Sequence, residues 1–202
     1  MFDKFIRVPK ERLLEPLALG PLRVFSPASL TISACVAGCL AGCVAAQQNY
    51  TLALCLWLLS RLLDGVDGTL ARVMHKQSDW GSYLDMMCDA LVYTAVPLGL
   101  AYGAMTIEAG AAATLLFSSF YVNIISWSYL SVLLERRQQG AHARGELTSI
   151  TMPSGLIEGT ETVIFYVLFL LFPQWFIALF VVMAALVFFT ATQRVWWASQ
   201  HL

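Results

Sequence analysis

Four aspartates in an otherwise apolar stretch are the residues of this chain best suited to chemistry. They are Asp64, Asp67, Asp85 and Asp89. An aspartate at the centre of a membrane helix costs about 2.5–3.5 kcal/mol on an insertion scale, so four of them need a compensating cation. The spacings of three and four residues place each pair on one face of a helix. Carboxylates suit Mg²⁺, Mn²⁺ or Ca²⁺, and four can hold two metals in the arrangement used for phosphoryl chemistry.

Small residues and one arginine accompany these carboxylates. Gly68 follows Asp67 directly, Gly81 precedes Asp85 by four residues, and Ala71 continues the same face. The missing side chain of a glycine lets a ligand approach the backbone closely. Arg72 places a cation that can fork onto a phosphate. Together these residues predict a diphosphate site.

The elements that position this site are predicted to be membrane helices. The chain is 58% hydrophobic and 12% charged, against about 25% charged residues in a soluble domain. Its net charge of −1 gives no basic field for nucleic acid. Six apolar runs are long enough to cross a bilayer, at 29–46, 50–71, 82–104, 109–134, 155–172 and 175–197. We expect an all-α integral membrane protein with six transmembrane helices, and the second and third forming a hairpin in which the carboxylate pairs face each other.

The charges predict the orientation. Of twelve Lys and Arg residues, eleven fall on one side of the six-span topology, and Arg61 lies inside the second run. Positive charge marks the cytoplasmic side, so both termini and the carboxylates are expected there. Residues 1–25 alternate cations with apolar residues, which predicts an amphipathic helix on the membrane surface. We expect one domain over 1–202, with 26–202 as the bundle. The cysteines at 35, 39 and 43 are expected to share a packing face.

Residues 64–89 read DGVDGTLARVMHKQSDWGSYLDMMCD. This is D-x2-D-G-x2-A-R-x8-G-x3-D-x3-D, which resembles the signature of the CDP-alcohol phosphotransferases at all eight fixed positions. The six-span plan and the N-terminal segment are also what that family implies. The resemblance therefore extends over nearly the whole chain.

The resemblance implies a role for each motif residue. Asp64, Asp67, Asp85 and Asp89 would bind metal, two Mg²⁺ or Mn²⁺ ions, and Asp89 would also be the general base for the acceptor hydroxyl. The CDP site would be lined by Asp64, Gly68, Ala71, Arg72 and Gly81. The activity implied is transfer of a phosphatidyl group from a CDP-lipid, CDP-diacylglycerol above all, to a small polar alcohol with release of CMP. A homodimer is a further expectation from the resemblance. The short, compact chain leads us to expect a bacterial inner (plasma) membrane.

Other functions remain open on sequence grounds. The acceptor can be glycerol 3-phosphate, serine, inositol, inositol phosphate or choline. Transfer of a CDP-linked amino alcohol to diacylglycerol is the alternative reaction. A cation transporter would also explain intramembrane carboxylates, and a membrane scaffold is a third class. A transporter leaves Gly68, Arg72 and Gly81 at their spacing unexplained, and a scaffold would not require four aspartates.

Several polar residues outside the motif have two interpretations each. Glu158 and Glu161 either recognise the acceptor or favour a helix N-terminus, and Asn123 either binds the acceptor or bonds a neighbouring helix. Arg61 either pairs with a carboxylate or extends to the interface. The loop arginines either hold a phosphate or set topology; they are Arg136, Arg137 and Arg144. His75 and His142 are not expected to be ligands.

Overall fold

The structure is a computed structural model that describes residues 16, 20, 24–138 and 155–202. The two long ranges form six α-helices and one short 3₁₀ helix. The helices are α2 (Pro27–Ala46), α3 (Tyr50–Val73), α4 (Asp79–Ala104), α5 (Ile107–Arg136), α7 (Gly159–Leu171), η2 (Pro173–Trp175) and α8 (Phe176–His201). Each α-helix falls on one of the predicted apolar runs, and the predicted ends are within a few residues of the observed ones.

Polar side chains fix where the helices begin. The Ser26 hydroxyl accepts a hydrogen bond from the Ser29 amide, and Pro27 occupies the first turn of α2. Asn49, Ser78 and Thr106 cap α3, α4 and α5 in the same way. A capping side chain satisfies one of the backbone donors that a helix leaves unpaired at its start. These caps allow very short connections between successive helices.

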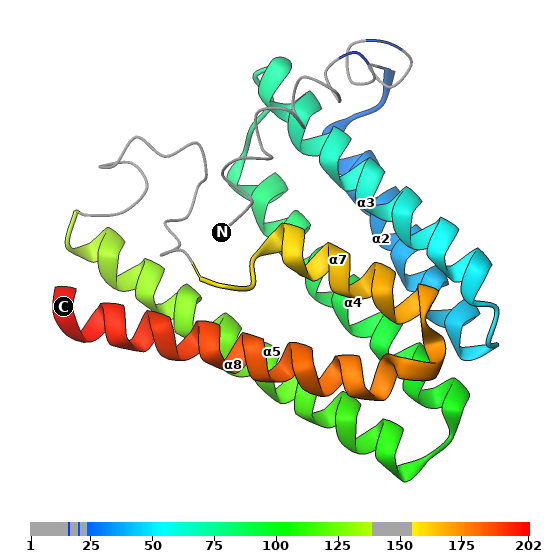
Figure 1. Ribbon diagram of the computed structural model, residues 1–202. Coiled ribbons are helices and arrows are strands. Elements are labelled where there is room, and N and C mark those ends of the chain that lie inside the picture. Colours follow the sequence, from blue (N-terminus) through cyan, green and yellow to red (C-terminus); the bar gives the residue numbers. More distant parts are fainter. Residues whose placement is uncertain (1–15, 17–19, 21–23, 139–154) are drawn as a thin grey trace.

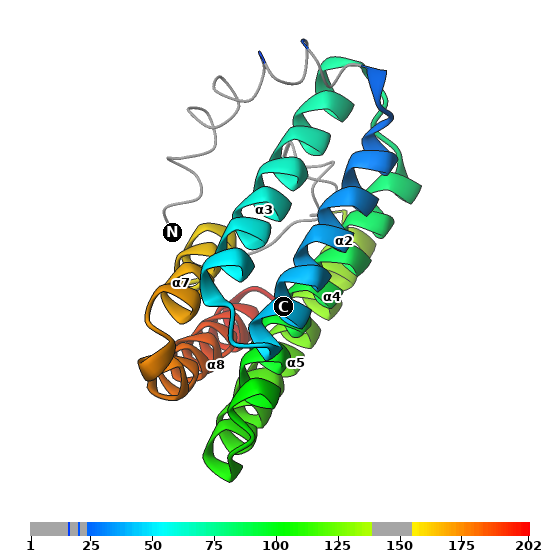
Figure 2. The same cartoon turned by 90° about the vertical axis from the view of Figure 1, so that its right-hand side faces the viewer.

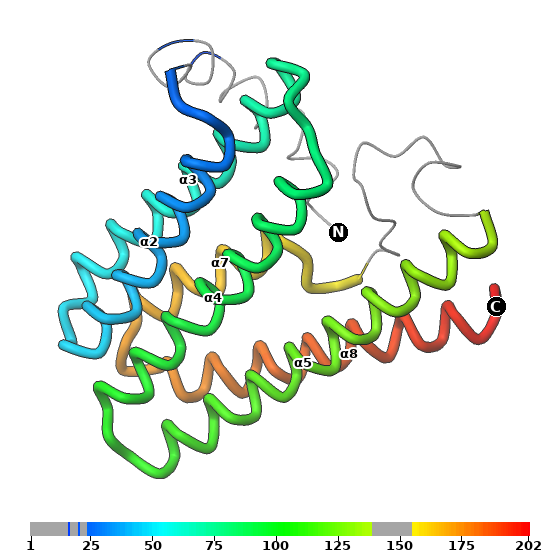
Figure 3. Tube along the Cα trace, turned by 180° about the vertical axis from the view of Figure 1, so that it is seen from behind, coloured from blue at the N-terminus to red at the C-terminus, as the bar shows by residue number. Residues whose placement is uncertain are grey.

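The helices form two packed groups. In the first, α2 lies against both α3 and α4; in the second, α5 lies against α8 along much of its length (Figures 1 and 2). Helix α7 contacts α3 and α8 and so joins the groups, and the short turn after α4 leads directly into α5 (Figure 3). The prediction that the second and third spans pack mainly against each other as a hairpin is therefore wrong. Helix α2 makes the extensive contacts to both α3 and α4, and the carboxylate-bearing helices face each other beside it.

Small residues allow α2 to pack this closely against α4. A Cβ atom at Gly99 would lie 2.0 Å from the Gly42 carbonyl oxygen, and one at Gly42 would lie 2.4 Å from the Ala95 carbonyl oxygen. Small residues at membrane helix interfaces let backbones approach closely. The register of α2 on α4 therefore depends on these glycines.

Replacing Gly99 with alanine is expected to destabilise the protein by about 1–3 kcal/mol, because the new methyl group meets backbone rather than a movable side chain. The measurement is thermal unfolding of the protein in detergent. Gly110→Ala in α5 is the matched control, since nothing lies within 4 Å of a Cβ atom there. Equal melting temperatures for the two variants would contradict the role given to the α2–α4 contact.

An aromatic cluster fills the centre of the bundle. Trp57 of α3 and Tyr166 of α7 are fully buried and stack with ring centroids 4.5 Å apart. Tyr166 donates a hydrogen bond to the Tyr93 carbonyl oxygen of α4, and its ring also contacts Phe169. This cluster holds α3, α4 and α7 together immediately next to the predicted site.

Within the described residues, four helices are long and apolar enough to cross a membrane: Pro27–Ala46, Asp79–Ala104, Ile107–Arg136 and Pro173–His201. Six predicted spans are thus confirmed only in part. Helix α3 is long enough at 24 residues, but it carries four charged residues, Arg61, Asp64, Asp67 and Arg72. Helix α7 has 13 residues, about 20 Å, against about 30 Å of hydrocarbon.

Two further predictions on packing can be compared with the structure. Cys35 and Cys39 are partly buried and pack against the core, whereas Cys43 is exposed. A step of four residues advances by about 40° beyond a full turn, so the third cysteine has rotated away from the shared face. The predicted amphipathic helix over 1–25 lies almost wholly outside the described residues.

Candidate active site

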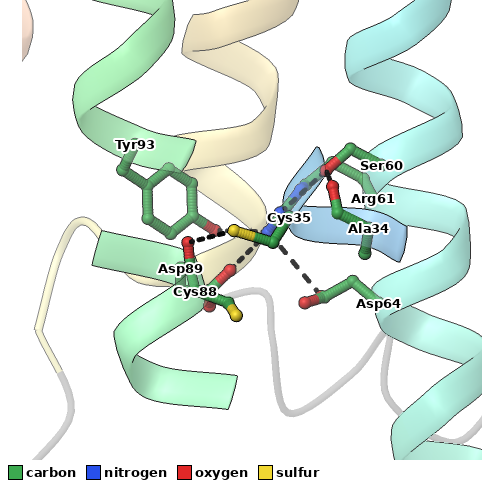
Figure 4. Close-up of polar contacts among 8 residues, drawn as sticks. All are labelled: Ala34, Cys35, Ser60, Arg61, Asp64, Cys88, Asp89 and Tyr93. Atoms are coloured by element: carbon green, nitrogen blue, oxygen red, sulfur yellow. Dashed lines mark hydrogen bonds and ion pairs between the residues drawn. The ribbon is translucent and has the colours of Figure 1, made fainter. Parts of the chain in front are cut away.

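Arg61 brings the carboxylates of α3 and α4 together. Its Nη1 lies 2.7 Å from Oδ1 of Asp89 on α4 and 3.7 Å from Oδ2 of Asp64, one turn along α3. Figure 4 shows the guanidinium between these two carboxylates, with the Tyr93 ring beside them. The predicted pairing of Arg61 with a carboxylate is confirmed. The two halves of the aspartate motif therefore meet in space.

Asp67 is less exposed to solvent than the other three aspartates of the motif. It is 4% exposed, and its Oδ2 atom is buried without a hydrogen-bond partner among the described residues. Thr31 of α2 and the backbone of Gly68 lie next to the carboxylate. An unpaired buried carboxylate oxygen is costly. A buried carboxylate oxygen without a side-chain partner is expected where that oxygen binds a cation instead.

All four aspartates lie close enough to repel one another. Asp64 is subject to repulsion from Asp89, Asp85 and Asp67, and Asp67 to repulsion from Asp85 and Asp89. Among the residues that the structure describes, no three acidic, His or Cys side chains are grouped tightly enough to hold one ion as they stand. The donor set nevertheless fits a divalent metal, because it consists only of hard oxygens and includes the unpaired oxygen of Asp67.

The predicted CDP-site residues lie on the same two helices. The Arg72 guanidinium approaches Gly68, where a Cβ atom would lie 3.4 Å from Nη1, and it donates to the Thr69 hydroxyl at 3.4 Å. Ala71 is half-buried in the same turn. Gly81 lies at the first turn of α4, where its amide donates to the Ser78 hydroxyl that caps the helix. These residues occupy the last two turns of α3 and the first turn of α4, next to the carboxylates.

Glu158 and Glu161 cap helix α7. The Glu158 carboxylate accepts from the Gly155 amide at 2.9 Å, and the Glu161 carboxylate accepts from the Glu158 amide at 3.2 Å. Both side chains take part in a capping box at the helix N-terminus. Of the two interpretations from sequence, the structure supports the helix-terminus role.

The structure also brings in residues that the sequence analysis did not select. Arg194 of α8 is 4% exposed and donates a hydrogen bond to the Asn123 side chain of α5, so Asn123 bonds a neighbouring helix. Trp57 and Tyr93 flank the Arg61 guanidinium at 5.0 and 5.2 Å from their ring centroids. Arg194 carried a usable signal, since a charge inside an apolar run is rarely without a partner. Trp57 and Tyr93 carried no sequence signal beyond their aromatic type.

The remaining candidates lie away from this centre or outside the described residues. His75 is exposed in the α3–α4 turn, where its φ is 52°. Arg136 is exposed, and Arg137 donates to the His201 carbonyl oxygen at 3.4 Å, which joins the ends of α5 and α8. His142 and Arg144 fall in 139–154, outside the described part of the chain.

Comparison with known proteins places this architecture in a family. Residues 24–192 match the family model described as CDP-alcohol phosphatidyltransferase. The inner membrane protein YnjF of Escherichia coli is 37% identical over 147 residues, which cover 73% of this chain and 70% of YnjF. The archaetidylinositol phosphate synthase of Pyrococcus horikoshii is 30% identical over 201 residues, which cover 98% of this chain and 94% of that enzyme.

Solved structures agree on the fold. Phosphatidylinositol phosphate synthase of Mycobacterium tuberculosis with CDP-DAG bound superimposes with a TM-score of 0.70 at 22% identity, covering 91% of this chain and 92% of that one. The same enzyme in complex with manganese and citrate gives a TM-score of 0.68 at 22% identity, covering 90% and 87%. The region that matches the family model, 24–192, includes the whole aspartate motif. The chain thus belongs to the CDP-alcohol phosphatidyltransferase family, and it is an integral membrane transferase of phospholipid biosynthesis.

Proposed function

We propose that this protein transfers a phosphatidyl group from CDP-diacylglycerol to the hydroxyl of a small polar alcohol, with release of CMP, in a divalent-metal-dependent reaction. The observation that carries the proposal is the meeting of Asp64 and Asp89 at Arg61, with the unpaired Asp67 oxygen nearby. Together these features make a concentration of negative charge that would bind divalent cations, and such cations would in turn bind a diphosphate.

Names of related proteins support the donor. The structurally similar synthase was solved with CDP-DAG, and separately with manganese and citrate. The archaeal relative is named as a synthase of archaetidylinositol phosphate. We extend to this chain the CDP-diacylglycerol donor and a Mg²⁺ or Mn²⁺ requirement, with two ions as the expected number. The acceptor is left as a small polar alcohol.

The residue roles follow from position and chemistry. Asp64, Asp67, Asp85 and Asp89 would hold the metal ions, which when bound neutralise the diphosphate and the leaving phosphate. Asp89 removes the proton of the acceptor hydroxyl. The acceptor oxygen then forms a bond to the β-phosphorus, the bond from that phosphorus to the bridging oxygen breaks, and CMP leaves. Arg72, beside Gly68, orients the donor diphosphate.

The surrounding architecture completes the proposal. Gly68, Ala71 and Gly81 leave room for CDP between the end of α3 and the start of α4. All six helices would cross or enter a bacterial plasma membrane as one domain, with both termini and the active site on the cytoplasmic side. We also propose a homodimer, on family resemblance alone.

The test is CMP release by purified protein given CDP-diacylglycerol and Mn²⁺ or Mg²⁺, with one candidate acceptor at a time. We expect one acceptor to give metal-dependent CMP together with the matching phospholipid. Parallel reactions with CDP-choline or CDP-ethanolamine and diacylglycerol test the opposite donor type. CMP release only in those reactions would replace the proposed donor, and no release with any pair would contradict the proposed reaction.

A further inference from the structure

Arg61 is held in place by far more than its ion pairs. Its side chain is 9% exposed, and the guanidinium lies over the rings of both Trp57 and Tyr93. Its Nη2 donates to the Ser60 hydroxyl at 3.1 Å, and Nη1 approaches the Tyr93 hydroxyl at 3.3 Å. Arginine over aromatic faces gains cation–π attraction, most strongly where water is excluded. The aromatic faces would retain this cation even without a carboxylate.

The same guanidinium touches the carboxylates that the proposed reaction assigns to metal. Nη1 contacts Oδ1 of Asp89 at 2.7 Å and approaches Oδ2 of Asp64 at 3.7 Å. Asp64 and Asp89 would hold a divalent ion through oxygens that lie 3.7 and 2.7 Å from Nη1, so the ion would lie within a few ångströms of the guanidinium. Two cations so close in a partly buried site repel each other strongly. The Asp89 carboxylate therefore cannot bind the metal ion and keep its full contact with Arg61 at the same time.

We propose that Arg61 is a built-in competitor of the divalent metal. It neutralises Asp64 and Asp89 from within the protein, and it gives up its contact with Asp89 but stays over Trp57 and Tyr93 when a metal ion binds both helices. Arg61 thereby sets the affinity for metal and keeps the carboxylate cluster compatible with a folded bundle. This inference rests on the proposed metal-dependent function. Arg61 acts through Asp89, so it is a positioning residue rather than a catalytic one.

A purely structural ion pair would behave differently. Such a pair would stabilise the bundle, and its loss would leave metal affinity unchanged or lower it by distorting Asp89. Removal of a competitor has the opposite effect on metal affinity, because it tightens metal binding. The same removal lowers the stability of the protein in chelator. The two readouts together separate these roles, since a distorted site cannot bind metal more tightly.

The experiment measures Mn²⁺ binding by the full-length protein in detergent, from the loss of the free-Mn²⁺ electron paramagnetic resonance signal, without nucleotide. The variants are Arg61→Gln, which removes the cation, and Arg61→Lys, which keeps a cation but loses the planar stacking and the fork. Lys76→Gln is the control, because it removes one exposed cation from the α3–α4 turn. Melting temperatures are recorded in EDTA and in Mn²⁺.

We expect Arg61→Gln to lower the Kd for Mn²⁺ by roughly ten- to a hundredfold, as the loss of a like charge within about 4 Å of the ion would give. Arg61→Lys should fall between that variant and the wild type, and Lys76→Gln should match the wild type. The melting temperature of Arg61→Gln should fall in EDTA and recover in Mn²⁺. Should Arg61→Gln not fold in EDTA, the Kd of Arg61→Lys still has to be lower than that of the wild type.

Two outcomes would overturn the proposal, and they differ in what else they affect. If the wild type binds Mn²⁺ but neither Arg61 variant binds it more tightly, the competition is wrong and the proposed reaction is unaffected. If the wild type binds no Mn²⁺ and releases CMP without added metal, the metal requirement and this inference both fail.

Discussion

Replacing Asp89 with asparagine is expected to reduce metal-dependent CMP release by about 10²–10⁴-fold, the contribution typical of a general base. Asparagine keeps the shape of the side chain but can neither take the acceptor proton nor contribute a negative charge to metal. The measurement is kcat for CMP release with the acceptor identified for the wild type.

The fold should survive this substitution. Arg61 retains Asp64 at 3.7 Å and the two aromatic rings, and an asparagine oxygen can still accept its hydrogen bond. Asp79→Asn is the control, because Asp79 is an exposed residue in the first turn of the same helix. An Asp89→Asn protein that melts like the wild type and keeps more than a tenth of its activity would rule out Asp89 as the base.

Replacing Asp67 with asparagine is expected to separate stability from metal binding. In EDTA the variant should melt no lower than the wild type, since an unpaired neutral amide costs less to bury than an unpaired carboxylate. Substitution also relieves the repulsion from Asp85 and Asp89. In Mn²⁺ the wild type should gain about 2.7 kcal/mol at a hundredfold excess over its Kd, and the variant should lose most of that gain.

The loss of this Mn²⁺-dependent stabilisation should be accompanied by a loss of activity. A metal ion at a phosphoryl site supplies several kcal/mol of charge stabilisation, so we expect kcat/KM of Asp67→Asn to drop by at least about a hundredfold. Thermal melts in EDTA and in Mn²⁺, beside CMP assays, measure both effects, and Asp79→Asn again serves as the control. A variant with the wild-type Mn²⁺ shift would show that the buried Asp67 oxygen has no part in metal binding.

The fold was predictable where it depends on local pattern. Apolar runs of span length predicted where the six α-helices of residues 24–138 and 155–202 lie, and capping residues such as Asn49 and Ser78 lie where two of them begin. Helix α7 was overestimated as a span, because the run from 155 to 172 includes four residues that precede the helix and supply its cap. Apolar composition indicates burial, but it does not distinguish lipid from protein surroundings.

Within the candidate site, spacing predicted which aspartates share a helix face but not what they contact. Asp64 and Asp67 are one turn apart, yet Asp64 lies beside Arg61 and Asp67 is buried near Thr31 of α2. That difference arises because α2 packs beside both α3 and α4, through contacts such as Gly42 on Gly99. A two-helix hairpin deduced from connection length could not include a third helix.

By itself, the sequence determined that this is a helical membrane protein with an acidic motif suited to CDP-linked chemistry, because hydropathy and residue spacing are local properties. Tertiary structure alone decided that Arg61 joins Asp64 to Asp89, that Trp57 and Tyr93 hold it there, and that Arg194 bonds Asn123 across α5 and α8. The contacts of Arg61 with Asp89 and Tyr93, like that between Arg194 and Asn123, connect residues distant in the chain. They depend on how closely helices approach and rotate, which is set by packing of the whole bundle rather than by any one segment.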